Sequence, residues 1–450
     1  MRFIGSRLPR AIQTAEAAAS VRRLFAFCLT IFLLAGCSAP AGSTPDLTQV
    51  FEQAMLTATY AIVPPTQQPS ATQPPATPTA ATPSATNQPS ATRYSGPAPT
   101  LAAAFNTTLL PSGSQPVTYI EDTCQYLKNR LDPNKSRPGT VVMAVMYHGI
   151  AEDGTAITDP MNVTHSDMVT FVEHAHETGF ETVTTAELTA FLEENAYIPP
   201  RSLYIILDDR RPGGVREHFW KYLKEYDWTL TLAWLIGDTD TRAASPLECC
   251  PDENYAGLWE QMEAYNASGY LDIQSHGNVH NTNITASSTD EYILSELNIS
   301  RQKIREHFYC KDPVTGLPVE NCDTAQPMAY IWAGGSFTPR SVQLARETGY
   351  RLGFTVNPRG PIMYNWIPQS LEYNPAMPSY IPEGPAGDPL MTLPRYWSTD
   401  AAYHMDDVAN MGDEAREYAK THRQEELNYY SYYCQDITGE IPTLEAGQAE

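Results

Sequence analysis

Residues 203–212, LYIILDDRRP, form a short apolar run that ends at two adjacent carboxylates, Asp208 and Asp209. An apolar run of this length, followed by polar residues and then by Pro212-Gly213-Gly214, is typical of a buried strand that leads into a loop. Successive strand residues point to opposite faces, so both carboxylates reach one site only if the strand ends there and the backbone turns. Two acids held together repel each other unless a cation lies beside them. The stretch therefore predicts a metal site, with an Asp pair that caps a turn as the alternative.

Strand and helix patterns alternate on both sides of this stretch. Helices are predicted to begin at capping signals such as 184–187 and 288–291, and at the Thr-Pro pair 338–339. Further buried strands are predicted at 141–146, 230–236, 271–275, 328–332 and 351–356. The alternation predicts a parallel α/β sheet or barrel with its site at the carboxyl ends of the strands.

Histidines follow two of the predicted strands. His276 and His280 come directly after the strand 271–275, four residues apart, which places them on one side of a helical turn. Two imidazoles and one carboxylate leave a position open for water on zinc or a similar ion. His148 follows the strand 141–146, whereas His404 lies beyond the last recognisable strand.

These motifs together resemble the NodB-like polysaccharide deacetylases, carbohydrate esterase family four, and most of all the branch of the poly-N-acetylglucosamine deacetylases. The resemblance implies a distorted (β/α) barrel that removes acetyl groups from a polysaccharide. Its T-F-D-D motif matches Leu207-Asp208-Asp209, which implies that Asp208 is the general base. Its H-S/T-x-x-H motif matches 276–280, which implies that Asp209, His276 and His280 bind a divalent metal, with Zn²⁺ as the first choice.

Three further segments match the family. In the named branch a Tyr-His pair supplies the general acid, which implies that role for His148. The segment 328–335 resembles the part that lines the substrate groove, and it assigns Tyr330 and Trp332 to substrate binding; Trp332 fits a core position equally well. Leu393-Pro394-Arg395 resembles a late L-P-R element and assigns Arg395 to substrate binding.

The chain also departs from the family pattern. Arg210 stands where Gly usually follows the Asp pair, Gly277 replaces Ser or Thr, and Ile331 replaces Pro. The arginine with which many relatives hold the base would fall at Ala329. These differences concern the orientation of the base and the shape of the pocket rather than the metal ligands.

The N-terminus has the parts of an export signal. Arg22-Arg23 precedes an apolar run too short to span a membrane, and Leu34-Ala35-Gly36-Cys37 resembles a bacterial lipobox. Cys37 is then the lipidated first mature residue, and the protein is extracytoplasmic and held at the cell membrane by its lipid anchor alone. A plain secretory signal is the alternative. Residues 64–100 are rich in Pro, Thr, Ser and Ala and predict an extended tether.

The predicted organisation has five parts: signal 1–37, linker 38–100, lead-in 101–137, deacetylase domain 138–400 and helical C-terminal tail 401–450. The net charge of -23 argues against a nucleic-acid partner.

Six cysteines remain once Cys28 and Cys37 are set aside, and an even number in an exported chain predicts disulfides. Cys310 and Cys322 flank a turn-rich loop and are predicted to pair. The adjacent Cys249 and Cys250 do not easily bond each other, so they are predicted to take Cys124 and Cys434 in an order left open. A cysteine zinc site is the alternative, but no C-x-x-C spacing supports it.

The sequence therefore predicts a metal-dependent hydrolase that removes acetyl groups from N-acetylated sugars of an extracellular or cell-wall polysaccharide. A catalytically inactive glycan-binding or structural protein on the same scaffold is the first alternative. A glycosidase would need two carboxylates about 5 to 10 Å apart across a cleft, which the adjacent pair fits poorly.

Overall fold

The computed structural model describes residues 93–209, 212–237, 239, 257–279, 283–312, 315, 317, 319, 322, 324–370 and 387–442. The chain divides into two compact units, 1–88 and 89–450, and all described residues belong to the second. The predicted export signal with Cys37 lies outside the described residues, as do Arg210 and His280. The predicted domain boundaries stay predictions. Among the described helices, none is both long and apolar enough to cross a membrane.

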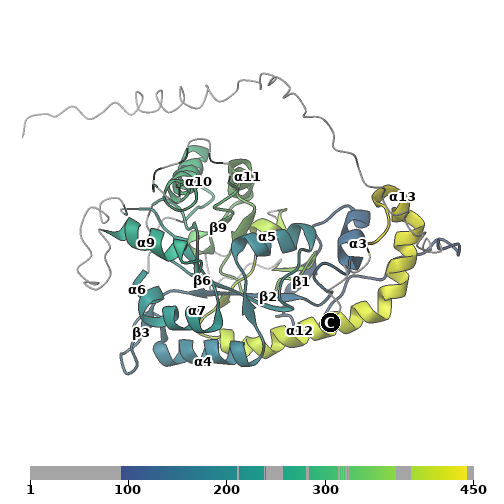
Figure 1. Ribbon diagram of the computed structural model, residues 1–450, viewed down its shortest axis with the longest axis horizontal. Coiled ribbons are helices and arrows are strands. Elements are labelled where there is room, and N and C mark those ends of the chain that lie inside the picture. Colours follow the sequence, from purple (N-terminus) through teal and green to yellow (C-terminus); the bar gives the residue numbers. More distant parts are fainter. Residues whose placement is uncertain are drawn as a thin grey trace, which may run out of the picture. The chain divides into compact units, whose positions relative to one another are not determined.

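An eight-stranded parallel sheet forms the centre of the fold (Figure 1). Its strands follow the order β10-β9-β8-β7-β6-β2-β12, and β5 pairs with β6 beside this path. The strands are β2 (Val141–Tyr147), β5 (Glu181–Thr182), β6 (Arg201–Leu207), β7 (Leu230–Trp234), β8 (Leu271–Ser275), β9 (Ala329–Ile331), β10 (Leu352–Phe354) and β12 (Tyr396–Trp397). Because every pairing in this sheet is parallel, the carboxyl ends of its strands lie at one edge.

The two ends of this sheet are joined by one segment. Leu393 forms a parallel bridge with Phe354 of β10, and three residues later Tyr396 pairs with Val145 of β2. The sheet therefore curls until its first and last strands contact the same stretch of chain. This is the distorted (β/α) barrel that the sequence predicted.

Helices connect and cover the strands. They are α3 (Thr123–Leu131), α4 (His165–Glu177), α5 (Thr185–Glu194), α6 (Pro212–Gly214), α7 (Trp220–Tyr226), α9 (Leu258–Ala267), α10 (Asp290–Ile304), α11 (Pro339–Thr348), α12 (Ala401–Tyr429) and α13 (Gln435–Thr438). Figure 1 shows α10 beside α11, and α12 beside α4. Two pairs of short strands complete the elements that the argument needs: β1 (Ser114–Val117) with β11 (Ile367–Ser370), and β3 (Ile150–Ala151) with β4 (Val163–Thr164).

The predicted helix starts agree with the structure in most details. Thr184 caps α5 in a capping box with Glu187, and Thr338 caps α11 with proline at its first position. Helix α10 differs by one residue, because its cap is Thr289 and not Ser288. The hydroxyl of Thr289 accepts the N–H of Tyr292, so it satisfies a donor that the helix leaves free.

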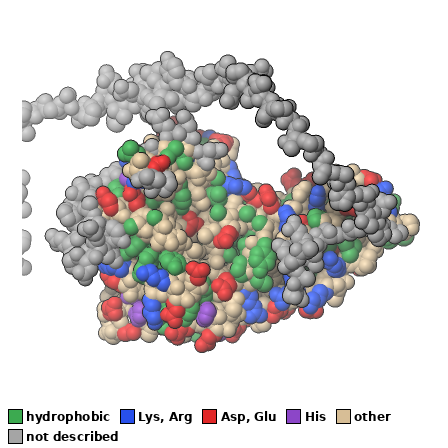
Figure 2. Space-filling model, viewed as in Figure 1, with side chains coloured by type: hydrophobic (Ala, Val, Ile, Leu, Met, Phe, Trp, Pro, Cys, Tyr) green, Lys and Arg blue, Asp and Glu red, His purple; other side chains and the backbone are tan. Residues whose placement is uncertain are grey.

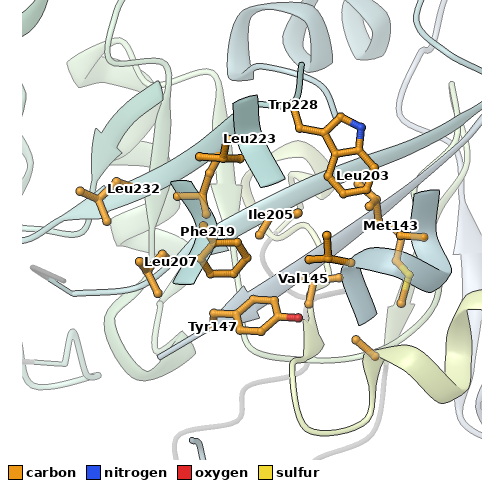
Figure 3. Close-up of a cluster of buried hydrophobic side chains, with 14 of the residues drawn as sticks. Met143, Val145, Tyr147, Leu203, Ile205, Leu207, Phe219, Leu223, Trp228 and Leu232 are labelled. Atoms are coloured by element: carbon orange, nitrogen blue, oxygen red, sulfur yellow. The ribbon is translucent and has the colours of Figure 1, made fainter. Parts of the chain in front are cut away.

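Strands β2 and β6 are buried on both faces, which explains their continuous apolar sequence. In β2, Val141, Met143, Val145 and Tyr147 belong to a cluster that includes side chains of α4, α7 and α12. Val142 and Ala144 belong to a second cluster, which includes side chains of α5. Figure 3 shows part of the first cluster, in which Met143, Val145 and Tyr147 of β2 lie near side chains of β6 and α7. Each large apolar side chain buried in this way contributes roughly 1.5 to 3 kcal/mol.

One predicted disulfide is confirmed. Cys310 and Cys322 are bonded, with their Cα atoms 5.5 Å apart, across the loop that follows α10.

The prediction for Cys124 and Cys434 is wrong. These two cysteines pair with each other instead of with Cys249 and Cys250, which lie outside the described residues. Helix α3 packs against the end of the chain's last long helical segment, and this packing brings the two Cα atoms to 5.1 Å. The bridge closes a loop of 310 residues, which in the loop-closure model is worth roughly 6 kcal/mol.

Candidate active site

The predicted catalytic and metal-binding residues within the described ranges follow β2, β6 and β8. His148 comes directly after β2, Asp208 and Asp209 after β6, and His276 after β8. Because these strands are parallel and share one sheet, their carboxyl ends present the four side chains at the same edge. The sequence-based placement of these four residues at strand ends is confirmed.

The backbone turns sharply at the two carboxylates. The N–H of Asp208 still donates to the main-chain oxygen of Tyr147 (2.8 Å), so the pairing of β6 with β2 continues to this residue. Asp209 then adopts φ +66°, a left-handed conformation that costs a residue other than glycine about 1 to 3 kcal/mol. The sequence required such a turn for both carboxylates to enter one site, and the structure has it.

Asp209 and His276 face each other. Asp209 Oδ1 lies 3.7 Å from His276 Nε2, and the side chain of Asp209 is 28% exposed. The other ring nitrogen of His276 lies 2.8 Å from the main-chain oxygen of Ile331. A carbonyl oxygen only accepts, so Nδ1 carries a proton, which leaves Nε2 as the ring nitrogen that can bind a metal ion beside Asp209.

This pair fits a metal ion. Two ligand atoms that each lie about 2.1 Å from one tetrahedral ion are about 3.4 Å apart, close to the observed separation. A main-chain acceptor that fixes the second ring nitrogen is the usual partner of a metal-bound histidine. The third predicted ligand, His280, lies outside the described residues. Within the described ranges, no group of three or more His, Cys, Asp or Glu side chains comes together as a metal site.

Arg395 holds Asp208. Its Nη1 donates to Asp208 Oδ1 (2.7 Å) and its Nε donates to the main-chain oxygen of Thr355 (2.7 Å). Burial raises the pKa of Asp208, but the charge of Arg395, helped by His276 and His148, more than offsets this, and the net pKa lies below the ordinary value. Asp208 is therefore an ionised carboxylate in an interior position.

The substrate-binding role predicted for Arg395 is wrong, because its side chain is 1% exposed and both of its observed hydrogen bonds stay within the protein. It instead supplies the base-holding arginine that the resemblance placed at the position of Ala329. The L-P-R element was visible in the sequence. Its contact with Asp208 depends on the segment that closes the barrel.

His148 lies beside Asp208. Its Nε2 is 3.6 Å from Asp208 Oδ2, because β2 and β6 are neighbours and Tyr147 pairs with Leu207. The implied acid role would place His148 on the far side of the metal from Asp208, whereas the structure places its ring directly beside Asp208. Burial lowers the pKa of His148, Asp208 raises it and Arg395 lowers it again, so that the net pKa lies below the ordinary value.

Tyr330 and Trp332 are not available to a sugar. Tyr330 is 2% exposed and Trp332 is fully buried in the cluster between β9, α10 and α11. The indole N–H of Trp332 donates to the main-chain oxygen of Met391 (2.8 Å), and its main-chain N–H donates to Phe354 (3.0 Å). The predicted substrate-binding roles of both residues are therefore wrong, and the alternative of a core position is right for Trp332.

Trp397 is an aromatic side chain at the site that sequence reasoning missed. It is half-buried and stacks on the His148 ring, with centroids 6.0 Å apart and an interplanar angle of 17°. Its strand, β12, is only two residues long, which is too short for a recognisable pattern. An indole that is partly open to solvent beside the strand ends is suited to stacking on a sugar ring.

Glu296 of α10 was also missed, and it holds the loop that carries the predicted histidine ligands. The carboxylate is 2% exposed and accepts the N–H groups of Asn278 (2.7 Å) and Val279 (3.0 Å). Gly277 adopts φ +99°, and a Cβ there would lie 3.0 Å from Glu296 Oε2 and 3.1 Å from the Tyr330 hydroxyl. The replacement of Ser or Thr by Gly277 therefore agrees with a loop drawn tightly onto this carboxylate.

Replacing Glu296 with alanine is expected to loosen this loop and to lower the affinity for zinc by about 10- to 100-fold, as loss of a residue that orients ligands commonly does. Glu296→Gln keeps one acceptor oxygen and should fall between alanine and the unchanged protein. Competition with a chromogenic chelator measures the affinity without reference to activity. Glu291→Ala, an exposed change in the first turn of the same helix, is the control. Equal zinc affinity in Glu296→Ala and this control would contradict the assignment.

Residues 197–353 match the family model described as polysaccharide deacetylase. The matched segment contains the Asp pair and both predicted histidine ligands. The match supports a deacetylase hydrolase that acts on polysaccharides. No curated protein matches the sequence.

Several solved structures are similar over part of the chain. The Streptococcus pyogenes deacetylase PplD, in complex with acetate, is 15% identical and covers 60% of this chain and 99% of its own, with a TM-score of 0.42. IcaB from Ammonifex degensii is 15% identical, covers 61% of this chain and 98% of its own, and has a TM-score of 0.40. The BpsB deacetylase domain from Bordetella bronchiseptica is 17% identical, covers 59% of this chain and 97% of its own, and has a TM-score of 0.36.

Proposed function

We propose that this protein is a metal-dependent deacetylase that removes acetyl groups from N-acetylated sugars of an extracellular or cell-wall polysaccharide. One observation carries the proposal: a buried, arginine-held carboxylate lies next to a carboxylate–imidazole pair suited to metal binding, within the segment that matches the deacetylase family. Hydrolysis of an amide needs a base for water, an electrophile for the carbonyl oxygen and an acid for the amine.

Asp209 and His276 would hold the metal, together with His280. A divalent ion there supplies a Lewis acid for the acetyl carbonyl and lowers the pKa of a nearby water to about 7. Zinc fits these ligand types best.

Asp208 would take the proton of the attacking water. Arg395 keeps it ionised and fixes its Oδ1, which leaves Oδ2 on the side of His148. His148 would return a proton to the departing amine. Its lowered pKa favours release of that proton, and its position beside Asp208 allows the base and the acid to share one proton during a turnover.

Trp397 would stack on the sugar that carries the acetyl group. An extracytoplasmic location belongs to the same proposal, since Cys37 and the Pro-rich tether would hold the domain near a surface polymer.

Acetate release from oligomers of N-acetylglucosamine and from peptidoglycan tests the function. We expect release from at least one of these substrates, loss of release with a chelator, and recovery when zinc is added back. Binding of the oligomers without acetate release at any metal concentration would favour the inactive glycan-binding alternative. Cleavage of the sugar chain with the acetyl groups retained would point to a glycosidase.

A further inference from the structure

A basic pocket lies far from the candidate active site. It has a volume of about 350 Å³ and lies between α12 and the stretch 130–138, which leads from the end of α3 toward β2. The stretch ends at the amino end of β2, and this seven-residue strand spans about 20 Å to its carboxyl end, where His148 follows. The pocket therefore lies at the opposite end of the barrel from the proposed chemistry.

The charge of this pocket is opposite to that of the chain. The full sequence has 29 basic and 52 acidic residues. The pocket is lined by two acids, Asp132 and Glu426, and by six basic residues. The basic residues are Arg130, Lys135, Arg137, Arg416, Lys420 and Arg423. On the face shown in Figure 2, acidic and basic side chains are interspersed.

Lys135 and Arg423 have no carboxylate partner in the described part of the chain. Arg130 pairs with Glu426 (3.0 Å), so these two charges cancel. Lys135 Nζ donates to Asn129 Oδ1 (2.9 Å) and to the main-chain oxygen of Glu194, and both acceptors are neutral. Arg423 is exposed and has no ion-pair partner among the described residues.

Two more cations at the pocket form only weak local ion pairs within the described part of the chain. Arg416 pairs with Asp413 and Lys420 with Glu417, each three residues away on the same helix. Exposed pairs of this kind contribute about 0 to 1 kcal/mol, so an incoming anion of higher charge can displace them. Arginine forks and lysine ammonium groups together are the usual ligands of phosphate.

We propose that this pocket binds a phosphate group, presented either by a soluble phosphate compound or by the headgroup of an anionic phospholipid. A pocket of this size accommodates a phosphate together with part of the molecule that carries it. The amino-terminal end of the described chain contacts the helical segment that follows α12. There Arg93 pairs with Asp436, and the N–H of Tyr94 donates to Ser431 Oγ (3.0 Å). The pocket and the entry of the predicted tether therefore share the helical segment formed by α12 and its continuation, which suits a headgroup at a membrane surface.

The test uses the full chain and two probes at low ionic strength. Isothermal titration with pyrophosphate measures soluble phosphate, and co-sedimentation with vesicles of phosphatidylglycerol and phosphatidylcholine measures lipid headgroups, with pure phosphatidylcholine vesicles as the blank. The variant is Lys420→Ala/Arg423→Ala, which removes two exposed charges from α12. The control is Lys221→Ala/Lys224→Ala, which removes two exposed lysine charges from α7.

Binding in either arm, weakened about tenfold or more by Lys420→Ala/Arg423→Ala and by less than about twofold in the control, supports the pocket. Binding of pyrophosphate alone identifies a soluble ligand, and binding of the anionic vesicles alone identifies the membrane surface. Absence of binding in both arms overturns the proposal. An equal loss in the variant and the control also overturns it, because the attraction would then be general. Acetate release plays no part in this result.

Discussion

Changing Asp209 to asparagine is expected to remove the metal and almost all acetate release. The lost carboxylate faces His276 at 3.7 Å and is one of the proposed metal ligands. Loss of a residue that only orients a ligand already costs about 10- to 100-fold in metal affinity, so loss of the ligand itself should cost more than about 100-fold. Zinc per chain, measured after dialysis, and acetate release should fall together.

Asparagine is the right replacement because of the backbone. Asp209 has φ +66°, and asparagine tolerates this left-handed conformation far better than alanine does. A loss seen in Asp209→Asn therefore reports on the ligand and not on the turn.

Asp208→Asn is the matched control on the neighbouring residue. It keeps the shape of the side chain and removes the proposed base, so turnover should fall by about 10² to 10⁴ while zinc content stays unchanged. Full zinc content in Asp209→Asn, or loss of zinc in Asp208→Asn, would contradict the division of roles between the two carboxylates.

The part of the site that lies close to strand ends could be predicted from the sequence. An apolar run that stops at two carboxylates requires a turn to bring both into one site, and Asp209 makes that turn. The histidine after β8 follows the same logic, since carboxyl ends of parallel strands share an edge. These predictions depend on local periodicity and on one rule of sheet topology.

The role of Arg395 could not be predicted in this way. Its contact with Asp208 joins residues 187 positions apart and depends on how the barrel closes through Leu393 and Tyr396. The two-residue strand β12 has no periodicity to detect. The motif was noticed, but motif matching carries no information about which way a side chain points.

The pairing of Cys124 with Cys434 was not predicted, for a similar reason. The sequence argument considered which cysteines cannot bond each other, and it had no access to the packing of α3 on the last helical segment. The error at Trp332 arose because the sequence does not show whether its side chain is buried. An aromatic residue beside a groove motif fits a sugar-binding surface and a core position equally well. The neighbours that decide between them come from α10 and α11.

Changing His148 to alanine is expected to lower turnover by about 10² to 10⁴ without loss of zinc, because the departing amine would lack its proton donor. The ring lies 3.6 Å from Asp208, so a purely structural role, that of holding the base, has to be separated from proton transfer. His148→Gln makes that separation, since its amide can still donate a hydrogen bond to Asp208 but cannot pass a proton on.

If His148 transfers the proton, glutamine should be as inactive as alanine; if His148 only positions Asp208, glutamine should restore most of the turnover. His404→Ala is the matched control, because His404 is 41% exposed on α12 and packs on Tyr396 of the strand next to β2. The assay is acetate release with zinc per chain measured on the same samples. Near-normal turnover in His148→Ala, or a larger loss in His404→Ala, would move the acid role away from His148, because a histidine that the reaction does not need cannot be its proton donor.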